Sequence, residues 1–144
     1  MPTQGYENHA QYVAGYHRVA LPLLILTLAG SVVNLVHSWG DHQRLYSASL
    51  IVVLTFCLLL IAGYARAFAL KAQDRAIRAE ENLRHFALTG KLLDARLTAR
   101  QIVALRFASD AEFVALAQRA AEEGLAPKAI KQSVKNWRAD EYRV

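Results

Sequence analysis

Two long runs of the chain contain no charged side chain. Asp, Glu, Lys and Arg are absent from Val19 to Val36, which is 18 positions, and from Leu45 to Ala65, which is 21 positions. An α-helix needs about 20 apolar residues to cross about 30 Å of hydrocarbon, whereas a helix at the surface of a soluble domain has a charged face. The pattern predicts two membrane-spanning helices, at residues 19–37 and 45–70, joined by an outer loop at residues 38–44.

A cleaved signal peptide is the alternative interpretation of the first run. The run is long, no Ala-x-Ala cleavage site follows it, and the second run begins after a short polar loop. We therefore expect both runs to remain as anchors. The single cysteine, Cys57, lies in the middle of the second run and has no cysteine to pair with, so we expect it to pack as a small apolar side chain.

Positive charge is concentrated after the second run. Fifteen of the 17 Lys and Arg residues lie from Arg66 onward, whereas the outer loop holds one arginine, Arg44, and one aspartate, Asp41. Positively charged flanks stay on the cytoplasmic side of a membrane. The sequence therefore predicts a cytoplasmic C-terminal half and, because two crossings return the chain to the same side, a cytoplasmic N-terminal segment at residues 1–18.

Small and hydroxylated residues repeat along one face of each predicted span. Such residues let membrane helices approach closely, and an amide in hydrocarbon requires a partner. We expect these faces to pack the two helices together or against a neighbouring subunit. A polar pathway for an ion or solute would require an oligomer, because two helices cannot enclose a pore and neither span carries a charge. The positions are Thr27, Gly30, Ser31 and Asn34 in the first span and Ala48, Thr55 and Ala62 in the second.

The second span is expected to continue as a helical extension at residues 71–90. Nothing between Arg66 and Thr89 breaks a helix, and Gly90 is the first C-terminal stop signal. An apolar seam with 4-3-4-3 spacing runs along one side of this extension. Because it covers only two heptads, we expect it to pack onto the helices that follow rather than to form a coiled coil. The seam comprises Ala72, Ala76, Ala79, Leu83 and Phe86.

The last segment, residues 91–144, is predicted to be a basic bundle of three short helices. Two capping boxes, in which two side chains cap each other's backbone N–H groups, start the first two helices. The second helix should run from Asp110 to Glu123, and Pro127 suits the first turn of the third. The boxes are Thr98 with Gln101 and Ser109 with Glu112, and the third helix is expected to bury Ile130, Val134 and Trp137.

Four basic residues are expected to share one face of this third helix, and three uses of that face remain open. It could be a solvated or protein-binding surface, it could contact anionic lipid headgroups, or it could bind DNA as the second helix of a helix-turn-helix. Nucleic acid is the least favoured partner, because the pattern is not specific. The residues are Lys128, Lys131, Lys135 and Arg138.

The chain carries no recognisable catalytic or cofactor motif. There is no Gly-rich phosphate loop, nucleophile elbow, H-E-x-x-H or C-x-x-C. The five histidines are dispersed, and the closest pair, His37 and His42, lacks enough firm ligands nearby for a metal site. We expect a protein that is not an enzyme and binds no metal or cofactor of its own. Contact of His17 or His37, at the span ends, with a cofactor of a partner is left open.

Four segments resemble a family of small, uncharacterised bacterial membrane proteins with two spans. The segments are YENHAQYVAGYH, RAFALKAQDRAIRAEENLRHF, LTGKLLDARLTARQIVALRFASDAEF and IKQSVKNWRADEYRV. The resemblance implies a location in the bacterial inner membrane. It implies no activity, ligand or site, because the family has none assigned.

Together these features predict an all-α membrane protein with a two-helix transmembrane hairpin, an extended second helix and a bundle of three short helices. The expected function is that of a membrane-anchored interaction protein, for instance an accessory subunit of a larger membrane complex such as an energy-transducing one. Its expected partners are the bilayer, a membrane protein or a second copy of itself. The alternatives are a homo-oligomeric channel or transporter and a membrane-tethered DNA-binding regulator.

Overall fold

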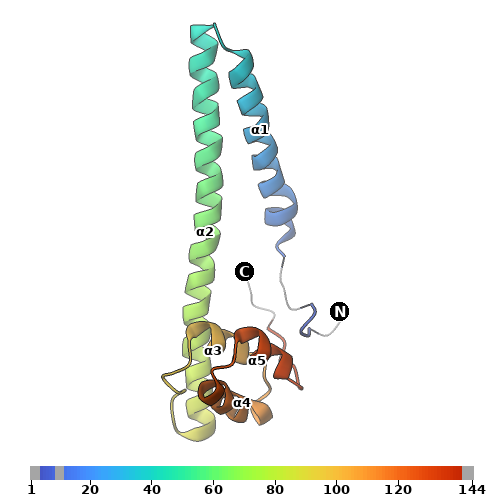
Figure 1. The fold of residues 1–144 in the computed structure, drawn as a ribbon, viewed down its shortest axis with the longest axis vertical. Helices are drawn as coiled ribbons and strands as arrows, with labels where there is room; N and C mark the ends of the chain where they lie inside the picture. The colour runs from blue at the N-terminus through green and yellow to red at the C-terminus, as the bar shows by residue number, and fades with distance from the viewer. Residues whose placement is uncertain (1–3, 9–11, 141–144) are drawn as a thin grey trace. The chain divides into compact units, whose positions relative to one another are not determined.

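The computed structural model describes residues 4–8 and 12–140, and every regular element in these ranges is a helix (Figure 1). The all-helical fold class is therefore confirmed. A π-helical turn leads directly into the first α-helix. The elements are η1 (Gly15–Ala20), α1 (Leu21–His37), α2 (His42–Thr89), α3 (Ala99–Leu105), α4 (Asp110–Glu123) and α5 (Pro127–Ser133).

The chain divides into two compact units. The first, here called the apolar unit, is Tyr12–Ala69, and the second, here called the charged unit, is Leu70–Val144 together with Met1–Gln11. The boundary falls inside α2, so this one helix contributes its first part to the apolar unit and its second part to the charged unit.

The ends of α2 follow from two local signals. The Asp41 carboxylate accepts the backbone N–H groups of Gln43 at 3.1 Å and Arg44 at 3.2 Å, which satisfies donors that a first helical turn leaves free. The helix therefore begins at His42, inside the stretch predicted as loop. At the other end Gly90 adopts a positive φ of 72°, which glycine tolerates without strain, and α2 ends at Thr89 as predicted.

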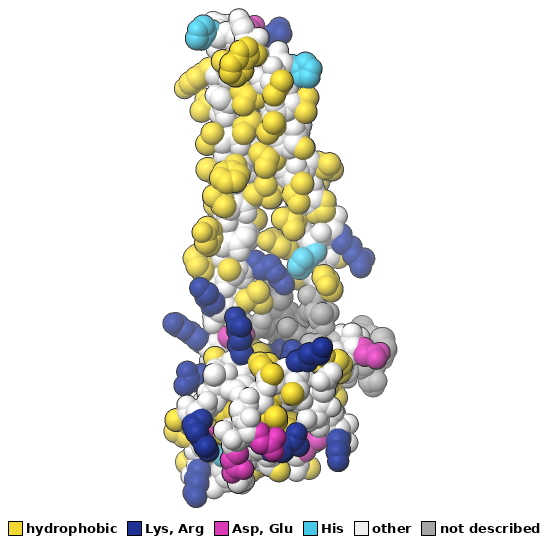
Figure 2. Space-filling view, viewed as in Figure 1, with side chains coloured by type: hydrophobic (Ala, Val, Ile, Leu, Met, Phe, Trp, Pro, Cys, Tyr) yellow, Lys and Arg dark blue, Asp and Glu magenta, His cyan; other side chains and the backbone are white. Residues whose placement is uncertain are grey.

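Large apolar side chains cover the outside of the apolar unit. Figure 2 shows hydrophobic side chains over the surface of α1 and of the first part of α2, where Lys and Arg are sparse. Among the exposed side chains are Leu26 at 68%, Ile61 at 62% and Val53 at 58%. Exposure of so large an apolar surface to water is unfavourable.

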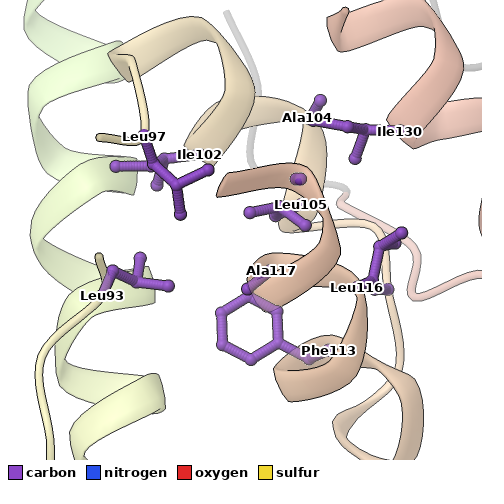
Figure 3. Packing of buried hydrophobic residues seen from close by; sticks show 11 residues of the cluster. Leu93, Leu97, Ile102, Ala104, Leu105, Phe113, Leu116, Ala117 and Ile130 are labelled. Atoms are coloured by element: carbon purple, nitrogen blue, oxygen red, sulfur yellow. The ribbon is translucent and has the colours of Figure 1, made fainter. Parts of the chain in front are cut away.

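The charged unit has a conventional apolar core. Phe107, Phe113, Leu105 and Ile130 are its largest fully buried side chains. Figure 3 shows the buried cluster gathered among α3, α4, α5 and the link that follows α2. Both predicted capping boxes are present, at the start of α3 and of α4, and Gly124 ends α4 in the left-handed conformation.

The predicted third helix is shorter than expected. α5 ends at Ser133, and Val134 is already extended, with φ −69° and ψ 121°. Backbone bonds to the link before α4 replace the helix: Ser109 N–H donates to Asn136 O at 3.2 Å, and Arg138 N–H donates to Phe107 O at 2.7 Å. Val134 and Trp137 therefore pack from an extended segment, and the prediction that they lie on a helix is wrong.

The predicted packing face of the α2 extension is also wrong. Leu83 and Phe86 are 69% and 51% exposed, and Ala72, Ala76 and Ala79 are exposed as well. The bundle instead covers Ile77 and Glu81, which are 6% and 4% exposed. Polar contacts of Arg84, described below, determine which side of α2 the bundle covers.

Candidate functional site

The helices of the apolar unit contact each other through a seam of leucines and small residues. The Ser31 hydroxyl lies 3.5 Å from the Thr55 hydroxyl, and the Tyr16 hydroxyl donates to the Ala62 carbonyl at 2.9 Å. The Arg66 guanidinium lies 5.6 Å from the centre of the Tyr16 ring. Residues spaced alternately three and four apart are buried or half-buried on both helices: Leu21, Leu24, Leu28, Ser31, Leu35 and Ser38, and Leu45, Ala48, Val52, Thr55, Leu59 and Ala62.

The structure brings together some of the predicted packing residues and leaves others outside. Ser31, Ala48 and Thr55 are buried, at 6%, 1% and 5% exposure, and Ala62 is half-buried. Thr27, Gly30 and Asn34 are exposed, and the Thr27 hydroxyl donates to Leu23 O within its own helix at 2.7 Å. The pattern of small residues alone does not include the leucines, whose heptad spacing marks the seam.

A buried arginine joins α2 to the bundle. Arg84 Nη1 donates to Glu81 Oε2 at 3.0 Å, Nη2 to Ala108 O at 2.7 Å and Nε to Asp110 Oδ1 at 2.7 Å. Its guanidinium carbon lies 4.3 Å from the centre of the Phe113 ring. Three hydrogen-bonded nitrogens and a stacked ring compensate the cost of removing the charge from water. The Arg84 guanidinium therefore holds α2 against the bundle.

A second cluster connects both ends of the described chain. Gln4 Oε1 accepts Asp140 N–H at 2.7 Å and Trp137 Nε1–H at 3.4 Å, and Gln4 Nε2 donates to Asp140 O at 3.2 Å. The Asp140 carboxylate in turn lies 2.8 Å from Arg106 Nε. Contacts between positions 136 residues apart leave no local signal in the sequence and so cannot be predicted from it.

A shallow groove of about 450 Å³ lies on the charged unit beside these clusters. Its walls include Gln73, Ile77, Glu81, Arg106 and Asp140. Most of its charged walls are paired within the fold, since Glu81 pairs with Arg84 and Asp140 with Arg106, whereas Glu80 is exposed. Across residues 4–8 and 12–140, no three His, Cys, Asp or Glu side chains gather in a way that could hold a metal ion.

The four predicted basic residues do not lie on one helix. Lys128 and Lys131 belong to α5, whereas Lys135 and Arg138 follow its end at Ser133. Lys135 donates its backbone N–H to Glu112, and the Arg138 guanidinium lies 3.8 Å from Glu81. The single helical face is therefore a wrong prediction, because the backbone bonds described above end the helix. At seven residues, α5 is also short for a DNA-reading helix.

Glu112 has a perturbed pKa because it caps two segments. Burial raises its pKa, but backbone N–H groups of Lys135, Asn136 and Ser109 donate to the carboxylate and outweigh that effect, so its pKa lies below 4.5. At the surface, a hydrogen bond from Arg96 lowers the pKa of Asp94 to about 2. Glu112 therefore acts as a cap for both α4 and the segment after α5.

The histidines named from the sequence lie apart. His17 Nδ1 is 3.1 Å from Val13 O, and His37 Nδ1 is 2.9 Å from Val33 O, so each ring bonds its own helix. His42 is exposed at the start of α2, and His9 lies outside the described residues.

Comparison with known proteins identifies a family but no individual relative. A family of unknown function, DUF6526, matches residues 1–144. No curated protein and no solved structure matches the chain. The match confirms the resemblance to an uncharacterised family, and it assigns no role to any residue.

Proposed function

The chain belongs to the DUF6526 family, whose function is unknown, and we propose that it is a membrane-anchored interaction protein. In this proposal η1 with α1 and the first part of α2 form a transmembrane hairpin. The charged unit is a cytoplasmic docking module of the bacterial inner membrane, and the protein is an accessory subunit of a larger membrane complex.

The exposure of the two apolar helices carries the proposal. Gly15–His37 and α2 are long and apolar enough to span a membrane, yet only 6% and 11% of their most apolar stretches are buried. A core helix of a soluble protein would have such residues buried. A bilayer is the solvent that matches an apolar exterior, and small and polar residues then form the helix contact.

The contacts of Gln4 support an even number of crossings. Gln4 lies before the first apolar helix and bonds Asp140, which lies after the second. This bond favours one compartment for both ends, which two crossings would provide. The 15 Lys and Arg residues from Arg66 onward favour the cytoplasm for that compartment.

The pairing of most charges around the groove favours docking over chemistry. Glu81, Arg106 and Asp140 are paired within the fold, Glu80 is exposed, and the exposed basic residues Lys128 and Lys135 lie on the same bundle. Exposed Asn34, on the outer face of α1, favours a neighbouring helix beside the hairpin, because an amide in hydrocarbon needs a partner.

Two experiments test the proposal. Extraction of membranes with alkaline carbonate should leave the full chain in the pellet; release into the supernatant would overturn the anchor. Purification of a tagged chain in a mild detergent should recover a stoichiometric larger complex, and recovery of only the chain or its homodimer would overturn the accessory-subunit role. A chain with Lys128→Gln and Lys135→Gln should stay in the membrane. It should recover less of the partner in the same purification, because these two residues contact the partner.

A further inference from the structure

We propose that the exposed seam of α2 pairs with the same seam of a second copy, forming a short parallel coiled coil next to the membrane. The seam comprises Ala72, Ala76, Ala79, Leu83 and Phe86. This inference rests on the membrane anchoring proposed above and names one partner of the protein.

The bundle of the charged unit leaves this seam open. At 100° per residue, the seam is centred about 150° around α2 from the face of Ile77, Glu81 and Arg84 that the bundle covers. Leu83 and Phe86 are 69% and 51% exposed. The side of α2 that packs within the chain thus includes the ion pair of Glu81 and Arg84, and the apolar side is left open.

The order of side chains suits a second helix of the same sequence. The 4-3-4-3 spacing places Ala76 and Leu83 at heptad position a and Ala72, Ala79 and Phe86 at position d. Three alanines let two helices approach closely, and Leu83 and Phe86 supply apolar area at the end of the seam. An equal partner would present the same small and large residues at the same height.

The flanking charges select the parallel arrangement. Arg75 falls at position g and Glu80 at the next position e, and both are exposed. In a parallel pair, g of one helix faces the following e of the other, so Arg75 meets Glu80 of the second copy twice by symmetry. In an antiparallel pair e faces e and g faces g, which places no opposite charges together, since the other e and g residues are Gln73, Asn82, Ala87 and Thr89.

The membrane anchor compensates for the short length of the seam. Two heptads are fewer than the three or four that mark a stable free coiled coil. Two copies inserted in one membrane in the same orientation have parallel helices and a raised effective concentration. The pairing therefore needs the full chain in its membrane.

Disulfide trapping tests the pairing. Two differently tagged copies, each with Cys57→Ala and Ala79→Cys, are expressed together, and their membranes are oxidised mildly. Position d residues face each other in a parallel pair, so a disulfide dimer should form in the majority of chains, and about half of the dimers should carry both tags. Arg78→Cys, exposed and about 120° from the seam, is the matched control and should form at least about tenfold less.

Charge exchange tests the orientation in the same assay. Arg75→Glu should reduce dimer formation about threefold, because two opposite-charge pairs become like-charge pairs, and adding Glu80→Arg should restore it. Equal trapping at positions 78 and 79, or no rescue by the exchange, would overturn the inference. A chain that stays in carbonate-washed membranes without trapping refutes the coiled coil alone, whereas release from the membrane refutes the anchor on which it rests.

Discussion

The two units of the molecule place their side chains in opposite ways. In the apolar unit the buried residues include Ser31, Thr55 and Ala48, and large aliphatic side chains face outward. In the charged unit Phe107 and Phe113 are fully buried, and most charged residues face outward. One chain thus uses two packing rules, and each rule suits a different solvent: apolar burial drives folding in water, whereas small and polar contacts hold helices in lipid.

The largest expected effect comes from the buried apolar core of the charged unit. Phe113→Ala removes a fully buried ring, and because the cavity adds to the lost apolar transfer, it should destabilise the charged unit by about 4 kcal/mol. Urea unfolding followed by Trp137 fluorescence measures this in a Trp39→Phe chain in detergent. Phe56→Ala, whose ring is 53% exposed in the apolar unit, is the control and should leave this transition nearly unchanged. Equal losses from both variants would contradict the comparison.

The next effect comes from Glu81, a carboxylate that is buried in the charged unit. Arg84→Met leaves Glu81, which is 4% exposed, without its closest cation, and the same urea unfolding should show a loss of about 3 kcal/mol. Adding Glu81→Gln removes the uncompensated charge and should recover most of that loss. If the double variant were as unstable as the single one, the role of Arg84 would be packing rather than charge compensation.

A smaller effect depends on pH. Glu112→Gln should cost about 1 kcal/mol near neutral pH, because a neutral amide caps less well than a carboxylate. The pKa of Glu112 is lower in the folded state than its ordinary 4.5, so its contribution is complete above 4.5 and is lost as pH falls through the folded pKa. Urea unfolding at a series of pH values should therefore bring the variant and the native chain together in acid; a constant difference would contradict this.

The smallest effect concerns the polar contact between the two helices of the apolar unit. Tyr16→Phe removes the hydrogen bond to Ala62 O and should weaken the helix pair by about 0.6 kcal/mol. In a Cys57→Ala chain with Ser31→Cys and Thr55→Cys, this should slow disulfide formation about threefold. Tyr12→Phe, at a ring that is 71% exposed, should not slow it. An equal response of the two tyrosines would remove Tyr16 from the helix contact.

Local signals in the sequence were sufficient for the starts of α3 and α4 and the ends of α2 and α4, and insufficient for the end of α5 and for the partners of each face. Both capping boxes, Gly90 and Gly124 act within one turn, so the sequence alone determines them. The end of α5 depends on Phe107, Ala108 and Ser109, about 30 positions earlier, and the covered face of α2 depends on where Arg84 finds acceptors. Such choices depend on tertiary contacts, which periodicity does not record.

The bond between Gln4 and Asp140 also orders events during synthesis. Gln4 precedes both apolar helices in the chain, and Asp140 follows them. Chains emerge N-terminus first and local units fold as they appear, so both apolar helices have left the ribosome before this bond can form. A chain whose helices had inserted an odd number of times would have the two residues on opposite sides of the bilayer. In the proposed hairpin, the contact between Gln4 and Asp140 therefore forms only in chains whose helices have crossed the membrane an even number of times.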